Sequence, residues 1–482
     1  MNRSILHMMR RLMLILAGIG FVLATGCSSN GTNVSVPTPR DASARPVRQA
    51  SGRSATSPIT HVIVIIQENR SFENFFAGYP GANAPLMGCA SPHPGGSKFE
   101  TSSGQCPAGD TVVALHQMTF ENNPDLKHDW ESSLVDWNKD NMDGFTAYGN
   151  KYAKDAAYGY VERKQVQPYW QMAQRYVLAD EMFPTEFGGS FTAHLMLVAG
   201  TDDIKLPNHA EVDFPSASGD CDAPPGTDTS YVQAKPYRRV HHHQGPEPCF
   251  AQFNTIAEVL DNAAISWRMY ASRVLHAGLW EPFEAINYVR HGPDWPSKIS
   301  APPVNILTDL SDGRLASVSW VTPLAQESDH PQYLNDTGPS WVSTVVNAIG
   351  ESSYWNSSAI ILLWDDWGGF YDNAPPPQLD YRGLGIRVPC IIISPYAKHG
   401  YVSHVQYEFG SILRFIEETY GLPIGSIGSV AQGYTDARAT SLDDAFNFLQ
   451  KPRAFRRIEA KYPKSYFLHA RPSALNLPVD TE

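Results

Sequence analysis

Two short stretches of the chain consist almost entirely of apolar residues. Residues 62–66 are all valine or isoleucine, and residues 358–364 are apolar after their first serine. Short runs of this kind predict strands that are buried on both faces, which is typical of a parallel sheet covered by helices. We therefore expect an α/β fold with a central, mostly parallel sheet flanked by helices.

The same pattern predicts further elements around this sheet. Apolar runs predict strands at residues 318–321 and 388–394 and a core segment around residues 265–270. Helices are expected within residues 165–182, leading into the apolar stretch 176–180, and at residues 191–199, 340–349 and 407–420. Residues 77–127 and 203–250 are rich in loop-forming residues and predict loop insertions, the second lying over the core.

Polar side chains follow both buried runs. Glu68 and Asn69 come after the first run, and Asp365 and Asp366 come after the second. Ligands of open α/β sheets bind at the carboxyl ends of strands, although a polar turn leaving a strand has the same composition. Three acids held close together repel one another, and burial raises their pKa values. A divalent cation removes this cost, and the oxygen donors favour Mg²⁺, Mn²⁺ or Ca²⁺ over Zn²⁺.

Several short motifs occur in order between about residues 60 and 422. They are residues 67–72, 188–190, 329–331, 364–366 with 368–372, 387–389 through 393–396, and His404 and Ser411 through 415–417. In these motifs the chain resembles the bacterial phosphoesterase family that contains phosphatidylcholine-hydrolysing phospholipases C and a class of acid phosphatases, related in fold to alkaline phosphatase. The resemblance implies an alkaline-phosphatase-like core and a metal-dependent phosphoric-ester hydrolase.

Ser190 is the nucleophile that this resemblance implies. It follows Gly188 and Gly189 and begins an apolar helix, whose free N–H groups favour a phosphate. A serine that contacts a metal can ionise and attack phosphorus, whereas a serine that only caps a helix has no such role. Family members place a metal-contacting serine here, so Ser190 is expected to complete the metal site. His194 lies one turn later and is expected to face the same pocket as a further catalytic residue, although many family members carry another polar residue there.

Two further histidines receive roles from the resemblance. His128 would donate a proton to a phosphate oxygen or to the leaving group, and His330 would approach the phosphate and relay a proton or stabilise charge. The chain departs from the family at Asn373, where many members have histidine, and at Glu73, where aspartate is more common.

The sequence leaves the substrate open between phosphomonoesters and phosphodiesters. The chain is shorter than typical phospholipases of the family, which favours a phosphatase or a broad phosphodiesterase, while a membrane anchor would suit a phospholipid. An alternative of another class is a non-catalytic cell-surface binding lipoprotein on a hydrolase scaffold. Asn373 supports that alternative, and the intact acids oppose it because acids are costly to bury without a function.

The first residues resemble an export signal. Arginines flank an apolar run at residues 12–24, which is too short for an ordinary membrane span, and the sequence Ala24-Thr25-Gly26-Cys27 follows. This predicts a lipoprotein signal peptide over residues 1–27 with Cys27 lipidated, or else a plain secretory signal. Residues 28–57 predict a disordered tether, 58–440 the catalytic domain and 441–482 a polar C-terminal extension. The protein is therefore expected to be exported and anchored to a membrane.

The other cysteines and the charge fit this location. Cys89 with Cys106 and Cys221 with Cys249 flank loop sequences and predict two disulfides, whereas Cys390 lies in an apolar run and predicts a buried thiol. The formal net charge is −12, which argues against nucleic-acid binding. Residues 241–243 are three consecutive histidines, which we expect to be solvated rather than to bind Zn²⁺.

Overall fold

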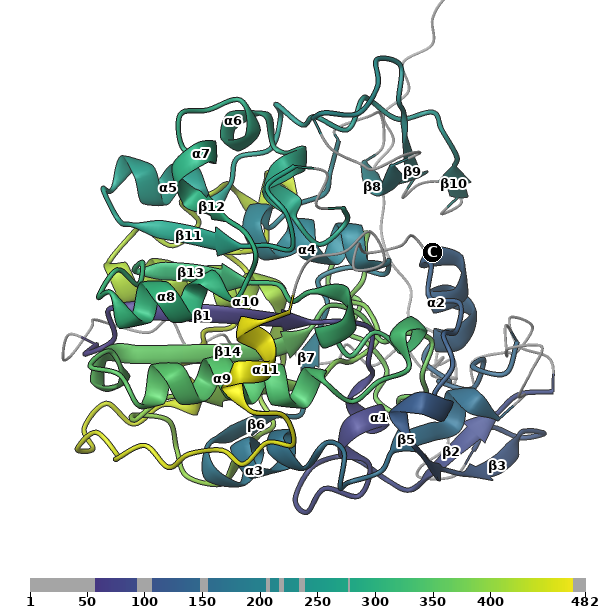
Figure 1. Cartoon of the computed structure of the whole chain (residues 1–482). Coiled ribbons are helices and arrows are strands. Elements are labelled where there is room, and N and C mark those ends of the chain that lie inside the picture. The colour runs from purple at the N-terminus through teal and green to yellow at the C-terminus, as the bar shows by residue number, and fades with distance from the viewer. Residues whose placement is uncertain are drawn as a thin grey trace, which may run out of the picture. The chain divides into compact units, whose positions relative to one another are not determined.

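A mostly parallel sheet forms the centre of the chain in a computed structural model that describes residues 57–92, 106–147, 155–204, 209–215, 221–233, 239–275 and 278–470 (Figure 1). All of these residues belong to one compact unit, residues 55–482. The predicted signal peptide with Cys27, and the predicted tether except for its last residue, lie outside the described residues.

The sheet has eight strands within the described residues. In spatial order they are β12 (Ile299–Ser300), β11 (Trp267–Tyr270), β13 (Val318–Val321), β1 (His61–Gln67), β14 (Ser358–Trp364), β15 (Cys390–Ile393), β6 (Val177–Ala179) and β16 (Tyr401–Ser403). Only β15 runs antiparallel to its neighbours among these strands. The predicted mostly parallel sheet is confirmed, and so are the two apolar runs as its central strands β1 and β14.

The register of the two central strands sets up the site. β1 and β14 pair from His61 opposite Ser358 to Gln67 opposite Trp364. The chain leaves both strands at the same level, and the Asp365 N–H donates to the Gln67 carbonyl oxygen at 3.0 Å. Glu68 and Asp365 therefore follow the two strands side by side.

The main helices form two groups, within each of which the helices pack against one another, and Figure 1 shows the first group in front of the sheet. The first group contains α3 (Gln167–Arg175), α8 (Asn305–Ser311), α9 (Gly338–Gly350) and α11 (Lys464–Leu468). The second contains α4 (Ser190–Ala199), α5 (Ile256–Asn262) and α10 (Phe409–Tyr420). The remaining helices are α1 (Phe72–Phe76), α2 (Trp130–Trp137), α6 (Asn287–Arg290) and α7 (Trp295–Lys298).

Three of the predicted helices are confirmed as α4, α9 and α10. The helix predicted within residues 165–182 is shorter than expected, because α3 ends at Arg175 and residues 177–179 form strand β6 in the main sheet. The buried, β-branched Val177 and its neighbours pair with β15 and β16, so tertiary pairing overrides the helical pattern there.

The expected loop insertions contain short strands. Residues 77–127 include β2 (Met87–Ala90), which pairs with β3 (Thr111–Ala114), and β4 (His116–Met118), which pairs with β5 (Gly159–Val161). Residues 203–250 carry a three-stranded sheet of β8 (Ala210–Pro215), β9 (Thr229–Gln233) and β10 (Arg239–His241). A further pair joins β7 (Met182–Phe183) to β17 (Tyr407–Glu408).

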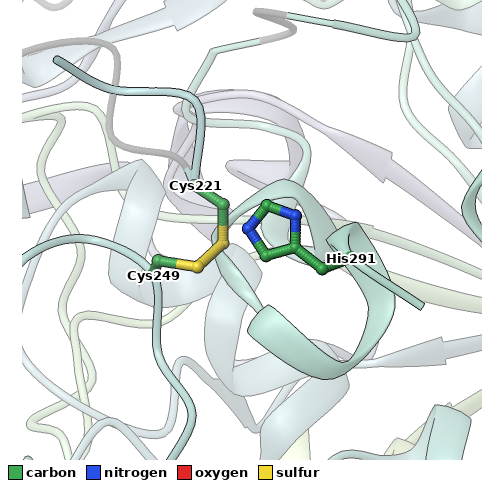
Figure 2. A group of neighbouring side chains, drawn as sticks. All are labelled: Cys221, Cys249 and His291. Carbon is green, nitrogen blue, oxygen red and sulfur yellow. A yellow bond between two sulfur atoms is a disulfide. The ribbon is translucent and has the colours of Figure 1, made fainter.

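Both predicted disulfides are confirmed. Cys89 bonds to Cys106 and Cys221 bonds to Cys249, and Cys390 is a buried free thiol. Figure 2 shows the second disulfide with His291 beside it. Each sulfur of this pair is used in the disulfide, so the group lacks the thiolates that a metal would need.

The C-terminal extension packs onto the domain as far as it is described. Ile458 and Phe467 are buried in the main core, and the Asn347 side chain hydrogen-bonds both the N–H and the carbonyl oxygen of Ile458, at 2.7 and 2.9 Å. Among the described residues, no helix combines the length and the apolar character that crossing a membrane requires.

Candidate active site

Glu68 and Asp365 meet at the carboxyl ends of β1 and β14. Both are fully buried, and the Glu68 N–H donates to the Ser328 carbonyl oxygen at 2.8 Å, which fixes the backbone where it leaves β1. Glu68, Asp365 and His194 each place one donor atom within 4.8 Å of the others. The prediction that the acids after the two strands lie close together is therefore confirmed for Glu68 and Asp365.

Asn69 adopts an unusual backbone conformation. Its φ is 58°, in the left-handed region that asparagine tolerates better than most residues, and its N–H donates to Asp365 Oδ1 at 2.8 Å. A Cβ on Gly368 would lie 2.2 Å from the Asn69 carbonyl oxygen, and Gly368 itself has a φ of 62°. Only glycine fits at position 368, so the Gly368-Gly369 turn lets Asp366 and Asn69 come together.

Ser190 lies at the first position of α4, after Gly189. Its hydroxyl donates to Asp366 Oδ2 at 3.2 Å, and the Asn69 amide nitrogen lies 3.4 Å from Ser190 Oγ. The helix ends at Gly200, which has a φ of 65°, and every residue between is buried. A helix packed on all sides holds its N-terminus, and thus Ser190, in a fixed position.

Asp366 lies in an environment that disfavours its charged form. Burial and the neighbouring charge of Asp365 raise its pKa well above the usual range, although the Gly368 N–H donates to Asp366 Oδ1 at 2.7 Å. Two adjacent buried carboxylates are costly unless a positive charge offsets them.

A divalent cation fits this donor set. Asn69 Oδ1 and Asp365 Oδ2 are buried and accept no hydrogen bond from any residue that the structure describes. Oxygen atoms in this state cost free energy unless something else binds them. With Glu68 and Asp366 they form an oxygen-rich set of the kind that Mg²⁺, Mn²⁺ and Ca²⁺ prefer.

His194 lies against Glu68 and is fully buried. Its Nε2 is 3.0 Å from Glu68 Oε1, and its Nδ1 has no hydrogen-bond partner among the described residues. If Nε2 carries the proton it donates to Glu68, and only a lone pair is left without a partner. If Nε2 instead bound a metal, a buried Nδ1–H would lack an acceptor, which costs more. Burial lowers the pKa of His194 to about 4, so it is neutral. His194 thus orients Glu68.

His128 and His330 face each other, with ring centroids 5.8 Å apart, and their tautomers follow from backbone contacts. His128 Nδ1 lies 2.6 Å from the Leu126 carbonyl oxygen and must donate to it, which leaves Nε2 to accept from the Asn69 amide at 2.8 Å. His330 Nδ1 accepts from the Gln332 N–H at 3.2 Å, so its Nε2 carries the proton. Burial, His128 and Arg70 hold the pKa of His330 well below its usual value.

These two histidines also lie with Asp125 in a second group whose donor atoms are within 4.8 Å of one another. A metal on His330 Nε2 would require a proton on Nδ1, where the Gln332 N–H already donates. The tautomer therefore fits His330 as a donor toward substrate better than as a metal ligand.

The structure adds Asp329 and Arg70, whose roles the sequence did not predict. Asp329 Oδ2 accepts from Tyr169 Oη at 2.6 Å, Trp364 Nε1 at 3.2 Å and Gln67 Nε2 at 3.4 Å. The Arg70 guanidinium donates twice to the Asp329 carbonyl oxygen, at 2.6 and 2.8 Å. Burial raises the pKa of Asp329 to about 6. Asp329, which directly precedes His330, is thus bound to both central strands. In the sequence, only its place in the motif at residues 329–331 indicated that it matters.

The departures from the family pattern lie in other contacts. The Asn373 side chain accepts from Arg387 Nη2 at 3.0 Å and donates to Asn83 at 2.9 Å, so it supports the buried Arg387–Asp372 ion pair. Glu73 is fully buried, and burial followed by the charge of Asp372 raises its pKa well above the usual range. His242 and His243 are exposed, while His241 stacks on Tyr231.

Comparison with curated proteins finds several phospholipases C. The chain is 24% identical over 458 residues to phospholipase C B of Mycobacterium tuberculosis, covering 82% of this chain and 78% of that protein. It is 24% identical to the non-hemolytic phospholipase C of Pseudomonas aeruginosa, covering 81% and 57%. It is 23% identical to non-specific phospholipase C4 of Arabidopsis thaliana, covering 78% and 70%.

Similar solved structures include a protein of the alkaline phosphatase superfamily from Vibrio parahaemolyticus, with 9% identity and a TM-score of 0.34 over 77% of this chain and 68% of that one. The lipoteichoic acid synthase LtaP of Listeria monocytogenes matches with 8% identity and a TM-score of 0.35, over 77% and 75%. Scores of this size carry no conclusion for the chain.

A protein-family model matches most of the chain. The model of the Phosphoesterase family matches residues 59–423, which include β1, α4, β14 and every residue of the site described above. The chain therefore belongs to the Phosphoesterase family and is a phosphoester hydrolase.

Proposed function

We propose that the chain is an exported, metal-dependent phosphodiesterase of the phospholipase C type, with Ser190 as its nucleophile. The observation that carries the proposal is the position of Ser190 Oγ. It lies at the N-terminus of α4, 3.2 Å from Asp366 Oδ2 and 3.4 Å from the Asn69 amide nitrogen.

Glu68, Asn69, Asp365, Asp366 and Ser190 would hold the cation. When bound, the ion lowers the pKa of a coordinated hydroxyl and polarises the phosphoryl group. Mg²⁺, Mn²⁺ or Ca²⁺ suits the oxygen donors better than Zn²⁺.

The residues of the chain supply the rest of the reaction. Ser190 Oγ passes its proton to Asp366 Oδ2, to which it is hydrogen-bonded, and attacks phosphorus, while the N–H groups of the first turn of α4 face the phosphate oxygens. The bond from Ser190 Oγ to phosphorus forms as the bond to the leaving oxygen breaks. His330 Nε2–H donates a hydrogen bond to that oxygen, which takes a proton from water, and water later hydrolyses the phosphoserine, when Asp366 returns the proton to Ser190 Oγ.

The diester substrate is favoured by the relatives and by the surroundings of His330. The relatives named above are phospholipases C. The ring of Trp280 stacks on His330 at 6.1 Å, and Tyr333 lies at 5.7 Å from the same imidazole. Aromatic faces of this kind suit an apolar or cationic group attached to the phosphate.

The test compares p-nitrophenyl phosphorylcholine with p-nitrophenyl phosphate, each with and without a chelator. We expect turnover of the choline diester that a chelator abolishes and that added Mg²⁺, Mn²⁺ or Ca²⁺ restores. Turnover of the monoester alone would mean an acid phosphatase. No turnover of either ester, together with no bound metal, would favour the binding lipoprotein.

Export and lipid anchoring are part of the proposal and rest on residues 1–27. In a bacterial host we expect the chain in the membrane fraction, and Cys27→Ser should release it. A protein that stays in the membrane fraction after Cys27→Ser would contradict an anchor at Cys27.

A further inference from the structure

The β2–β3 ribbon, residues 86–90 with 111–115, exposes apolar side chains. Leu86 is 47% exposed, Met87 50% and Val112 56%. The two strands pair antiparallel, and the Cys89–Cys106 disulfide anchors β2 to the chain just before β3. Met87 and Val112 share one face of the ribbon, because Val112 pairs with Cys89, two residues after Met87, and half-exposed apolar side chains grouped on one face are typical of an interaction surface.

The ribbon is uncharged in an acidic chain. Residues 80–92 and 111–115 contain no acidic or basic side chain, while the chain as a whole carries a formal charge of −12. An anionic membrane would repel such a chain, and a basic partner would find no acid on the ribbon. A neutral, apolar surface complements a zwitterionic lipid layer, into whose interface apolar side chains can insert.

The ribbon contacts the segment of the chain that follows Asp366. The Tyr371 ring lies so close to Gly88 that a Cβ there would be 2.6 Å from it, and Tyr158 Oη donates to the Cys89 carbonyl oxygen at 2.6 Å. Tyr371 belongs to the segment after Asp366, and its carbonyl oxygen accepts from Ser71 Oγ at 2.7 Å. Figure 1 shows β2 and β3 beside α1 and β5, on the side toward which the carboxyl end of β1 points.

We propose that Met87 and Val112 insert into the surface of a zwitterionic phospholipid bilayer and hold the active site at the lipid interface. The proposal rests on the proposed phospholipase C activity for its purpose, but the surface itself can be tested without catalysis. The ribbon is then a docking element that acts on vesicle substrates and has no effect on a soluble ester.

The test uses the chain from residue 28, which keeps the whole compact unit, so that neither the apolar run at residues 12–24 nor a lipid on Cys27 contributes, and phosphatidylcholine vesicles in a sedimentation assay. The variant Met87→Glu/Val112→Glu should bind at least about tenfold more weakly, because charge is costly in the interface. Val112→Trp should bind more tightly, since tryptophan favours the membrane interface, and sedimentation of each protein without vesicles separates this gain from aggregation. Leu449→Glu, at a side chain that is 90% exposed, is the matched control and should bind like the parent.

Hydrolysis of p-nitrophenyl phosphorylcholine should be the same in all four proteins, while hydrolysis of vesicles should follow binding. If the parent does not bind vesicles, or if the double variant binds as well as the parent, the proposal is wrong. A concentration-dependent dimer that the double variant abolishes would overturn it in favour of a second copy of the chain. Vesicle binding without turnover of any ester would leave the surface standing and refute the proposed activity.

Discussion

The amide nitrogen of Asn69 lies 2.8 Å from His128 Nε2, and this contact fixes which end of the amide points away from His128. The same nitrogen lies 3.2 Å from Asp366 Oδ2, so both neighbours accept from it. Asn69 Oδ1 is left buried and without a hydrogen-bond partner in the part of the chain that the structure describes. The contact with His128 thereby keeps Asn69 Oδ1 available as a ligand for the proposed cation.

Replacing His128 should therefore weaken metal binding. His128→Phe removes the acceptor and should reduce the affinity for Mn²⁺ by about 10- to 100-fold, the range found for residues that orient metal ligands. His128→Gln can still accept through its amide oxygen and should retain most of the metal. Equilibrium dialysis with metal analysis measures this. Full metal content in His128→Phe, with only catalysis lost, would instead assign His128 to proton transfer.

Ser190→Ala should abolish turnover without unfolding the protein. Nucleophile removal typically costs several orders of magnitude in kcat, roughly 10⁴-fold or more. Ser343→Ala is a matched control, because Ser343 is a buried helical serine whose hydroxyl donates to the Pro339 carbonyl oxygen at 2.7 Å. Single-turnover kinetics with a nitrophenyl ester and thermal unfolding should separate the two variants. Ser190→Ala with full activity would refute the nucleophile.

Asp329→Asn should reduce kcat with little change in KM. Asp329 is not among the residues proposed to contact the substrate or the cation, but its carboxylate is held by Tyr169 and Trp364, and it directly precedes His330. A displaced imidazole would donate poorly to the leaving oxygen, so the loss should be about 10- to 100-fold and largest for esters with poor leaving groups. A merely structural residue would not produce this dependence on the leaving group.

The matched control for that experiment is Asp309→Asn. Asp309 Oδ2 also accepts from a buried tyrosine, Tyr270 Oη, at 2.8 Å, and it lies on α8 outside the site. Asp309→Asn should lower the free energy of unfolding to a similar extent and leave kcat unchanged. Equal losses of kcat in the two variants would remove Asp329 from the catalytic arrangement.

The sequence predicted the parts of this site that depend on short stretches. Buried runs at residues 62–66 and 358–364 imply strands, and acids after each strand imply a shared edge, because parallel strands end together. The glycine pair before Ser190 and the apolar run after it similarly predict a helix start. All of these inferences use a periodicity or a neighbour within a few residues.

The contacts across the fold were beyond the reach of such patterns. Asp329 is held by Gln67, Tyr169 and Trp364, which come from three different elements, and no local pattern pairs them. Strand β6 lies within the range predicted as a helix, because its partners β15 and β16 are more than two hundred residues later in the chain and no local pattern indicates that pairing. The tautomers of His128 and His330 likewise depend on backbone atoms whose positions only the structure gives.

Glu327→Gln should change how stability depends on pH. Burial raises the pKa of Glu327 to about 8 from the usual 4.5, and its carbonyl oxygen accepts from Gln67 at 3.0 Å. A raised pKa means that the native state holds a proton which the unfolded state releases. The stability of the parent is then greatest below pH 4.5 as far as this group is concerned. It falls by on the order of 1.4 kcal/mol per pH unit up to about pH 8.

Glutamine carries no such proton, so urea unfolding at pH 5 and pH 8 should show a smaller fall in the free energy of unfolding for the variant. An equal fall in both proteins would mean that Glu327 is ionised in the native state at neutral pH.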